Sequence, residues 1–476
     1  MEGLEISEID FSKAFSITGE MRWDSDYYQK HYLDNERLIH SLSTVRLSKL
    51  CASIKKGIFD LSPENYIEEG VPFIRTSEIK SPTINFSSTV FLPEKISSEN
   101  YKTELMPGDL VFTKIGAYIG DVALLPSRYE KYNFSQNVAG ASVIDKRNSA
   151  YLLAFFLSKE GKTQILRSAM LSGQGKLELE DIRNYEIPEV SHEFKKQLGV
   201  LLRQKQSLEL EVSAKYEQAE NLLLATLGLT NFTPCAETVN VKTFKDSFAA
   251  TGRLDAEYYQ PKYEQIVKHI TAQSHDRLIK LVDIKKSIEP GSDAYSEDEE
   301  GLPFLRVADY SKYGITKPQK CLSASFVAEK QDELEALKPK KGTILFSKDG
   351  SVGEAFCLHQ DADFITSGAV LHLTVKNPDE LLPDYLTLAL NSKLVRMQAE
   401  RDAGGSIILH WRVGEIEDVV VPLVDMPTQE KIAAEVQESF SLKAESERLL
   451  DVAKRAVEIA IEQDESAGMA YIEANS

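Results

Sequence analysis

The stretch Arg22-Trp23-Asp24-Ser25-Asp26-Tyr27-Tyr28-Gln29 returns 231 residues later as Arg253-Leu254-Asp255-Ala256-Glu257-Tyr258-Tyr259-Gln260. At the same displacement, Gly70-Val71-Pro72-Phe73-Ile74-Arg75 returns as Gly301-Leu302-Pro303-Phe304-Leu305-Arg306. Chance does not readily produce two separated motifs in one register, so the chain contains two copies of one domain. Each copy, at roughly 230 residues, is long enough to bury a sizeable core.

The order of signals after these motifs is the same in both copies. A glycine turn leads into a strand at Pro107–Lys114 and at Lys341–Lys348. Helices are predicted next at Tyr151–Leu166 and Pro383–Ala399, and a glycine-rich loop follows at Ser172–Lys176 and at Ala403–Ser406. Each copy ends in a long polar helix, predicted at about 193–227 and 428–461. Apolar positions recur in both at spacings of three and four residues, which indicates one apolar face per helix. The simplest arrangement packs these helices on each other, and the alternative packs each on its own globular domain.

We therefore predict an α+β protein in which two similar mixed α/β domains are separated by a pair of long antiparallel helices, with an internal pseudo-two-fold repeat. The predicted segments are a first globular domain with its N-terminal element, a central helix, a second globular domain, a C-terminal helix and an acidic tail, at residues 1–190, 191–230, 231–426, 427–463 and 464–476 respectively.

Composition limits the function classes. The net charge of −19 argues against a protein that coats nucleic acid non-specifically, so any DNA contact must use local basic clusters. Residues 1–231 hold 27 Lys+Arg and 32 Asp+Glu, whereas residues 232–476 hold 28 and 42, giving −5 and −14. No signal peptide or membrane-spanning run is expected. Four scattered cysteines in a long chain are typical of a reduced, cytoplasmic protein.

No catalytic, cofactor-binding or metal-binding residues are predicted on this chain. The glycine pairs Gly116/Gly120 and Gly350/Gly353 lack the dinucleotide and P-loop fingerprints. Asn377-Pro378-Asp379-Glu380 lacks the second proline and the aromatic residue of an amino-methyltransferase turn. We find no nuclease-like carboxylate spacing and no His-x-x-x-His pair.

Polar side chains recur instead beside the predicted strands and glycine loops. Arginine, lysine, glutamine and serine are the side chains that contact phosphates and base edges. The candidate DNA-binding residues are Arg75, Thr76, Ser77, Lys114, Tyr118, Gln174, Lys176, Arg306, Lys348, Ser351, Ser406, His410, Trp411 and Arg412. For Arg75 and Arg306, structural ion pairs are an equal alternative. The aromatic residues Tyr27, Tyr28, Tyr258 and Tyr259 stand beside acids and fit a packed domain edge or a partner-docking surface better than a DNA contact.

Taken together and in order, these paired motifs resemble the specificity (S) subunit of Type I restriction–modification systems, over about residues 10 to 463. The resemblance implies two target-recognition domains that each read one half of a bipartite double-stranded DNA site. It also implies a non-catalytic subunit that recruits two adenine-N6 methyltransferase (M) subunits, which carry S-adenosylmethionine, and in some complexes motor-nuclease (R) subunits. Two departures are the divergent element at Trp23–Asp26 and the acidic run Glu297–Glu300.

Three alternatives remain open from the sequence. One is a specificity-like subunit of another methylation-associated antiphage system. The others are a stand-alone DNA-modifying enzyme with an unrecognised site and a scaffold that binds only proteins.

Overall fold

The computed structural model describes residues 7–9, 25–116, 118–169, 175–237, 239–296, 301–405 and 408–476. The chain divides into two compact units. Unit 1 contains residues 1–206 and 446–476, and unit 2 contains residues 207–445. The boundaries fall inside the two long helices, so each unit holds part of both.

Unit 1 is built around a four-stranded antiparallel sheet with the strand order β2-β10-β7-β8. A second sheet has the order β6-β3-β9, and two short pairs, β1-β11 and β4-β5, complete the strands. The strands are β1 (Thr44–Arg46), β2 (Cys51–Lys56), β3 (Val71–Ile74), β4 (Ile79–Lys80), β5 (Thr83–Ile84), β6 (Val90–Leu92), β7 (Leu110–Thr113), β8 (Val122–Leu124), β9 (Asn133–Phe134), β10 (Val138–Val143) and β11 (Glu186–Pro188). The helices are η2 (Ser25–Tyr28), α1 (Lys30–His40), α2 (Leu47–Leu50), η3 (Pro63–Asn65), η4 (Phe86–Ser88), α3 (Glu94–Glu99), η5 (Tyr101–Thr103), η6 (Lys146–Asn148), α4 (Ser149–Leu157), α5 (Lys159–Ala169), α6 (Leu179–Asn184) and α17 (Glu465–Asn475).

Unit 2 repeats this topology, with the sheets β13-β21-β18-β19 and β17-β14-β20 and the pairs β12-β22 and β15-β16. Its strands are β12 (His275–Arg277), β13 (Val282–Lys286), β14 (Leu302–Leu305), β15 (Tyr310–Ser311), β16 (Gly314–Ile315), β17 (Lys320–Leu322), β18 (Ile344–Ser347), β19 (Ala355–Cys357), β20 (Ile365–Thr366), β21 (Val370–Val375) and β22 (Val420–Pro422). Its helices are α8 (Phe248–Thr251), α9 (Pro261–Thr271), α10 (Leu278–Leu281), η7 (Ser292–Ala294), η8 (Val307–Asp309), α11 (Ala324–Glu329), α12 (Gln331–Leu337), α13 (Pro383–Asn391), α14 (Lys393–Asp402) and α15 (Val413–Glu417). The predicted mixed fold and its duplication are confirmed.

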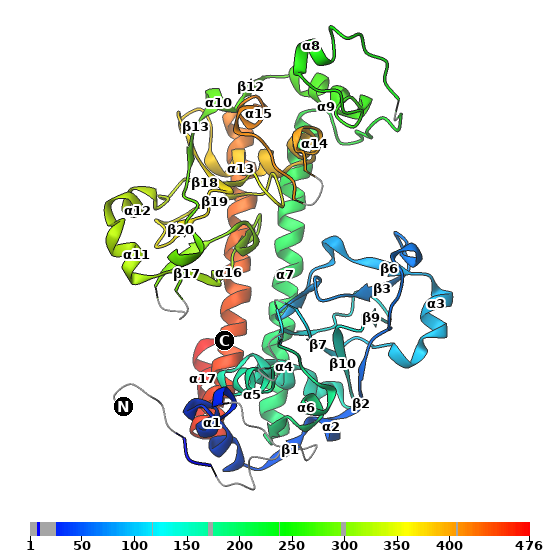
Figure 1. Ribbon diagram of the computed structural model, residues 1–476, viewed down its shortest axis with the longest axis vertical. Coiled ribbons are helices and arrows are strands. Elements are labelled where there is room, and N and C mark those ends of the chain that lie inside the picture. Colours follow the sequence, from blue (N-terminus) through cyan, green and yellow to red (C-terminus); the bar gives the residue numbers. More distant parts are fainter. Residues whose placement is uncertain are drawn as a thin grey trace. The chain divides into compact units, whose positions relative to one another are not determined.

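The two predicted long helices are present as α7 (His192–Thr226) and α16 (Met426–Glu462). In each unit they run side by side and antiparallel (Figure 1). In unit 1 the Ser446 hydroxyl donates to the Lys205 carbonyl at 3.5 Å, and in unit 2 the Ser439 hydroxyl donates to the Val212 carbonyl at 3.1 Å. The two bonds follow the same antiparallel register. This agreement is expected, because the sequence repeat makes Lys205 equivalent to Ser439 and Val212 equivalent to Ser446.

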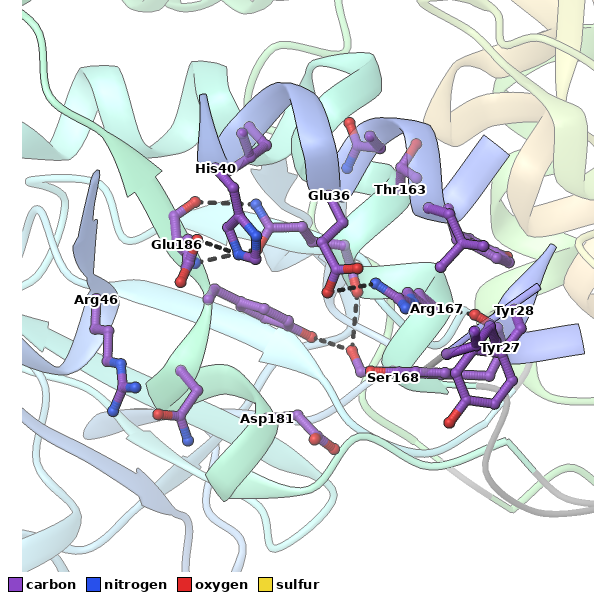
Figure 2. Close-up of a pocket in the computed structure, with 18 residues that line it drawn as sticks. Tyr27, Tyr28, Glu36, His40, Arg46, Thr163, Arg167, Ser168, Asp181 and Glu186 are labelled. Atoms are coloured by element: carbon purple, nitrogen blue, oxygen red, sulfur yellow. Dashed lines mark hydrogen bonds and ion pairs between the residues drawn. The ribbon is translucent and has the colours of Figure 1, made fainter. Parts of the chain in front are cut away.

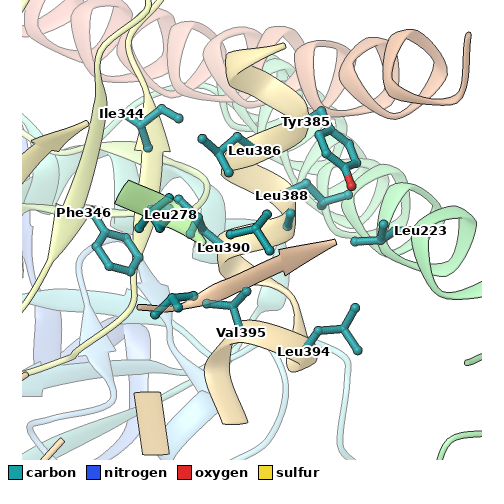
Figure 3. Close-up of a cluster of buried hydrophobic side chains, with 14 of the residues drawn as sticks. Leu223, Leu278, Ile344, Phe346, Tyr385, Leu386, Leu388, Leu390, Leu394 and Val395 are labelled. Carbon is teal, nitrogen blue, oxygen red and sulfur yellow. The ribbon is translucent and has the colours of Figure 1, made fainter. Parts of the chain in front are cut away.

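The apolar faces of these helices pack both on each other and on the globular part of the unit. In unit 2, Leu223 of α7 joins a core that also holds the buried residues of α13 and α14 (Figure 3). Helix α13 is buried all round because Leu386 and Leu390 face the sheet residues Ile344 and Phe346 while other side chains meet α7. The long helices therefore pack both on each other and on a globular part. In unit 2, however, α7 packs on the second globular part and not on the one that precedes it in sequence.

The helical stretches predicted at Tyr151–Leu166 and Pro383–Ala399 are each two helices. Ser158 separates α4 from α5, and Ser392 separates α13 from α14, both with extended backbone angles. The Ser158 hydroxyl accepts the backbone N–H of Gly161 at 3.3 Å, which caps the second helix. Periodicity did not reveal these breaks because the apolar pattern continues through them.

Among the described residues, no helix combines the length and apolar character that crossing a membrane requires.

Candidate nucleic-acid interface

The predicted lysines and glycine-loop residues come together at one end of the four-stranded sheet in each unit. In unit 1 the backbone N–H of Leu177 donates to the Lys114 carbonyl at 2.9 Å, and Ile115 pairs with Lys176. In unit 2 the N–H of Trp411 donates to the Lys348 carbonyl at 2.7 Å, and Asp349 pairs with His410. The chain that leaves each glycine loop thus returns beside the end of strand β7 or β18.

In unit 1 this end carries cations and aromatic rings. Burial lowers the pKa of the Lys114 ammonium, and although Glu178 raises it, the neighbouring cations Lys176 and Lys56 lower it further. Lys176 also forms an ion pair with Glu178 at 2.7 Å. In the adjacent loop, the Lys80 ammonium lies 4.5 Å from the centroid of the Tyr118 ring. A half-buried tyrosine beside lysines is suited to contact a base and a phosphate together.

The equivalent end of unit 2 has different chemistry. Lys348 and His410 both contact the carboxylate of Asp349, with 2.8 Å between His410 Nδ1 and Asp349 Oδ1. Ser351 is exposed, and the Arg412 side chain is 78% exposed. Trp411 is a correction: its side chain is 1% exposed and packs on Phe346, in the position that buried Leu177 holds in unit 1. An indole buried in this way cannot contact a base without unpacking the core.

Arg75 and Arg306 occupy equivalent positions after β3 and β14. Arg75 forms an ion pair with the fully buried Glu78 at 2.7 Å, and this bond raises the pKa of the arginine. Arg306 forms the matching pair with buried Asp309 at 3.3 Å. These are the structural ion pairs that the sequence left open, although 31% and 36% of the two side chains remain exposed.

The remaining predicted residues are placed as follows. Thr76 is half-buried, and the exposed Ser77 donates its hydroxyl to Glu78 Oε1 at 2.8 Å. Gln174, Ser406 and the acidic run Glu297–Glu300 lie outside the described residues.

The tyrosine element of unit 1 is held at a domain edge. Arg167 of α5 lies over the Tyr27 ring at 4.1 Å, donates to the Tyr27 carbonyl at 3.1 Å and pairs with Glu36 at 3.2 Å (Figure 2). Tyr28 lies beside Tyr27, and both border a cavity of about 450 Å³. A half-buried aromatic edge of this kind can serve as a docking surface.

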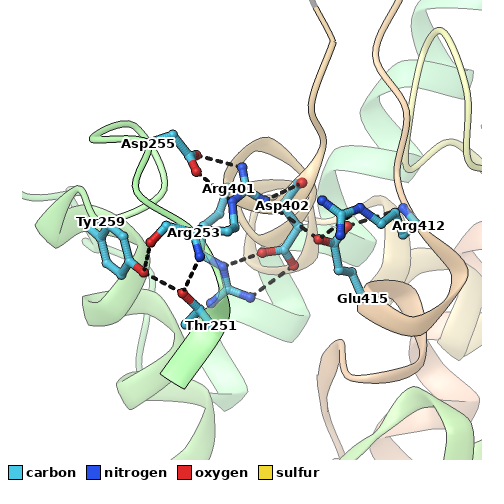
Figure 4. A network of polar contacts seen from close by, with 8 residues as sticks. All are labelled: Thr251, Arg253, Asp255, Tyr259, Arg401, Asp402, Arg412 and Glu415. Atoms are coloured by element: carbon cyan, nitrogen blue, oxygen red, sulfur yellow. Dashed lines mark hydrogen bonds and ion pairs between the residues drawn. The ribbon is translucent and has the colours of Figure 1, made fainter. Parts of the chain in front are cut away.

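The same arrangement recurs in unit 2 with other partners. Arg401 of α14, the equivalent of Arg167, lies 5.3 Å from the Tyr258 ring. Arg401 also pairs with Asp402 at 2.6 Å (Figure 4). Arg253 approaches the same ring at 4.5 Å, and the Tyr259 hydroxyl donates to the Arg253 carbonyl at 3.0 Å. An arginine over the first tyrosine is therefore common to both copies.

A cationic groove in unit 1 escaped the sequence analysis. It has a volume of about 280 Å³ and lies between the start of α4 and the first turns of α7. Among its described lining residues no carboxylate occurs, and the cationic members are Lys146, Arg147, Lys195, Lys196 and Arg203, with His192 beside them. Lys195 and Arg203 form no ion pair with any described residue. In the sequence, the adjacent basic pairs Lys146-Arg147 and Lys195-Lys196 could have indicated this groove.

The corresponding surface of unit 2 is not cationic. The helix register places Gln429, Glu430 and Gln437 where unit 1 has Lys195, Lys196 and Arg203. The cations of the unit 1 groove therefore have no basic counterpart at these three described positions of unit 2.

Comparison with known proteins gives the family. The model of the Type I restriction modification DNA specificity domain matches residues 41–208 and 279–449, which together exceed half of the chain. The chain belongs to this family. It is a non-catalytic DNA-recognition subunit of the Type I restriction–modification kind.

Two solved structures are similar to this chain at low sequence identity. The Type-I restriction-modification system S subunit from M. genitalium is 13% identical, with a TM-score of 0.35, and the match covers 90% of this chain and 95% of that one. The HsdS subunit from Thermoanaerobacter tengcongensis is 16% identical, with a TM-score of 0.28 and coverage of 89% and 97%. Scores this low leave the family match as the basis of the assignment. A comparison with curated proteins found no match.

Proposed function

We propose that this chain specifies a bipartite target on double-stranded DNA, with each unit reading one half, within a restriction–modification complex. The observation that carries the proposal is the doubling of one specificity domain with different chemistry at equivalent strand ends. Unit 1 presents Lys176 and Tyr118 beside the buried Lys114, whereas unit 2 presents Lys348 and His410 joined through Asp349. Equivalent scaffolds with unlike side chains suit two unlike half-sites.

The cationic groove of unit 1 is proposed to contact the DNA backbone. Phosphate contacts supply much of the affinity of DNA-binding proteins, and a chain with a net charge of −19 needs local cation clusters to make them. The groove offers such a cluster, because its described lining holds five Lys and Arg residues and no carboxylate. The unequal grooves further imply that unit 1 contributes more of the salt-sensitive binding.

We propose that two adenine-N6 methyltransferase subunits dock at the repeated tyrosine elements, one at Tyr27 and Tyr28 and one at Tyr258 and Tyr259. Both elements present the same arginine–tyrosine stack, as two copies of one partner require. The methyltransferases would bind S-adenosylmethionine and extrude the target base, and this chain would supply sequence choice. A motor-nuclease subunit is a further expected partner, and the complex is expected in the cytoplasm.

The deciding experiment uses the chain purified with the methyltransferase encoded beside it. Genomic DNA from cells with and without this chain is sequenced for N6-methyladenine. We expect a bipartite motif that requires the chain, and exchange of residues 45–190 for those of another family member should change one half-site only. Methylation that is independent of the chain, or a motif without two halves, would contradict the proposal.

The alternative of a related antiphage methylation system predicts the same motif and differs in the neighbouring genes. Methyl transfer by the isolated chain would instead favour a stand-alone enzyme. A protein-only scaffold would show no salt-sensitive, sequence-specific DNA binding in the assembled complex.

A further inference from the structure

Three metal-ligating side chains converge in unit 2, at the end of strand β19. Cys357 ends the strand, His359 follows it, and Asp384 lies in the first turn of α13. One potential ligand atom from each lies within 4.8 Å of the other two. Cys357 and Asp384 are buried, whereas 41% of the His359 side chain is exposed. The group therefore has an inner, dry side and an outer side that solvent can reach.

The carboxylate of Asp384 organises the group. Its Oδ1 lies 2.8 Å from His359 Nε2, and its Oδ2 accepts a hydrogen bond from the Gln437 side chain at 2.6 Å. The Cys357 thiol donates to the Leu358 carbonyl at 3.9 Å, and burial, more than the nearby Asp384 carboxylate, raises the thiol pKa. The sulfur and the imidazole nitrogen thus both lie near the same carboxylate. In a tetrahedral zinc site, ligand atoms about 2.0–2.3 Å from the ion stand about 3.3–3.8 Å apart. These separations lie within the 4.8 Å limit that the three ligand atoms meet, and the 2.8 Å contact between His359 and Asp384 would lengthen on binding.

Comparison of the two copies shows that the fold does not require these residues. Leu110 pairs with Leu124 as Ile344 pairs with Cys357, so Leu124 is the equivalent of the cysteine. Continuing that strand register, Pro126 stands in place of His359. The hydroxyls of Tyr151 and Tyr385 make the same bond to the proline carbonyls of β11 and β22, which places Ala150 where Asp384 stands. All three ligands are present in one copy and all three are absent at the equivalent positions of the other.

We propose that Cys357, His359 and Asp384 bind one Zn²⁺ ion, with water in the fourth position on the exposed side. A thiolate with an imidazole suits zinc, whereas magnesium and calcium prefer oxygen ligands alone. Binding releases the thiol proton to solvent, because a coordinated sulfur is deprotonated, and His359 coordinates as neutral imidazole. Gln437 would hold the carboxylate in place from α16, as an outer hydrogen-bond partner commonly does.

A site built in this way joins strand β19 to helix α13, two elements of one unit. Because the ion binds the folded unit, it should raise the thermal midpoint of unfolding as its concentration increases. The site was not recognisable in the sequence, because the cysteine and the histidine stand two residues apart and the third ligand comes 25 residues later. Zinc binding here does not depend on the proposed DNA target.

The test is titration of the metal-free full-length chain with Co²⁺ under reducing conditions, followed by displacement with Zn²⁺. We expect one equivalent of Co²⁺ to produce the thiolate-to-cobalt charge-transfer band and the visible bands of tetrahedral cobalt. Cys357→Ser should abolish the charge-transfer band. His359→Gln should weaken Co²⁺ binding at least about tenfold, the lower end of the effect of losing even an outer partner.

Cys321→Ser is the matched control, because Cys321 is a half-buried cysteine of the same unit that belongs to no ligand group among the described residues. It should keep the full signal. Should Cys357→Ser fail to fold, the partly exposed His359 variant decides the matter alone, with circular dichroism as the check on folding. Absence of the charge-transfer band in the wild type, or an unchanged Co²⁺ affinity in His359→Gln, would overturn the proposal.

Discussion

Removing two groove cations should reduce the salt dependence of DNA binding by a predictable amount. The perturbation is the double substitution Lys195→Gln and Arg203→Gln in α7. Both residues line the cationic groove and lack an ion-pair partner among the described residues. Glutamine keeps a helix propensity close to that of lysine and arginine, so α7 should stay intact.

The magnitude follows from counterion release. Each phosphate contact adds about 0.9 to the slope of log K against log salt, so losing two contacts lowers the slope by about 1.8. Between 50 and 200 mM salt this slope change corresponds to about a 12-fold smaller loss of affinity in the variant than in the wild type. The recognised sequence should not change, because phosphate contacts carry no base information directly.

The assay is fluorescence anisotropy of a labelled duplex bound to the chain in complex with its methyltransferase, over a salt series. Lys454→Gln with Arg455→Gln is the matched control: it removes two charges from the neighbouring helix, where Asp451 and Glu458 already pair with them. The control should keep the wild-type slope. An equal slope in the groove variant would refute the DNA-backbone role, and weakened methyltransferase binding with an unchanged slope would identify the groove as a protein contact.

Three further outcomes are expected. Leu388→Ala, which truncates a side chain with no exposed surface, should lower the free energy of unfolding by about 2–5 kcal/mol in urea titrations, and a loss below about 1 kcal/mol would contradict the described core. Burial lowers the pKa of His372 to about 4, so the unfolded chain binds more protons than the folded chain below about pH 6.5. The free energy of unfolding should therefore fall by up to about 3 kcal/mol as the pH drops from about 6.5 towards 4. His372→Gln should remove that part of the pH dependence. Inserting four residues after Gln206 and four after Glu445 keeps the antiparallel register of the two helices within each unit. Each insertion lengthens its helix by about 6 Å, which should lengthen the gap between the DNA half-sites by at most about two base pairs. An unchanged gap would show that the helices do not set it.

The duplicated fold could be predicted because a sequence repeat can be recognised even where the local helix and strand propensities are weak. The register between Tyr27 and Tyr258, and between Lys114 and Lys348, identifies equivalent strands and helices without knowledge of their pairing. The division of the long helices between the units was not predictable in this way. It depends on which globular part covers each half of α7, and one-dimensional periodicity carries no such information.

The candidate interface was predicted in part. Lys114 and Lys176 meet, as do Lys348 and His410, because the glycine loop returns to the strand end in both copies. The prediction that Trp411 contacts DNA was wrong, because its polar neighbours His410 and Arg412 suggested an exposed position. The backbone instead directs the indole into the core. The groove cations were missed because Lys146 and Lys195 are 49 residues apart in sequence, and only packing of α4 against α7 brings them together.

The composition of unit 1 has a consequence for the order of folding during synthesis. Unit 2 is continuous in sequence, but unit 1 needs residues 446–476, which emerge about 240 residues after Gln206. At a synthesis rate of about 5–20 residues per second, that delay is about 12 to 48 s. During this interval the N-terminal globular part lacks residues 446–476, so the face of α7 that packs against them stays exposed. Unit 2, which is encoded later, can complete its folding first. Ribosome-associated chaperones would thus be expected to meet the first half of this protein and not the second.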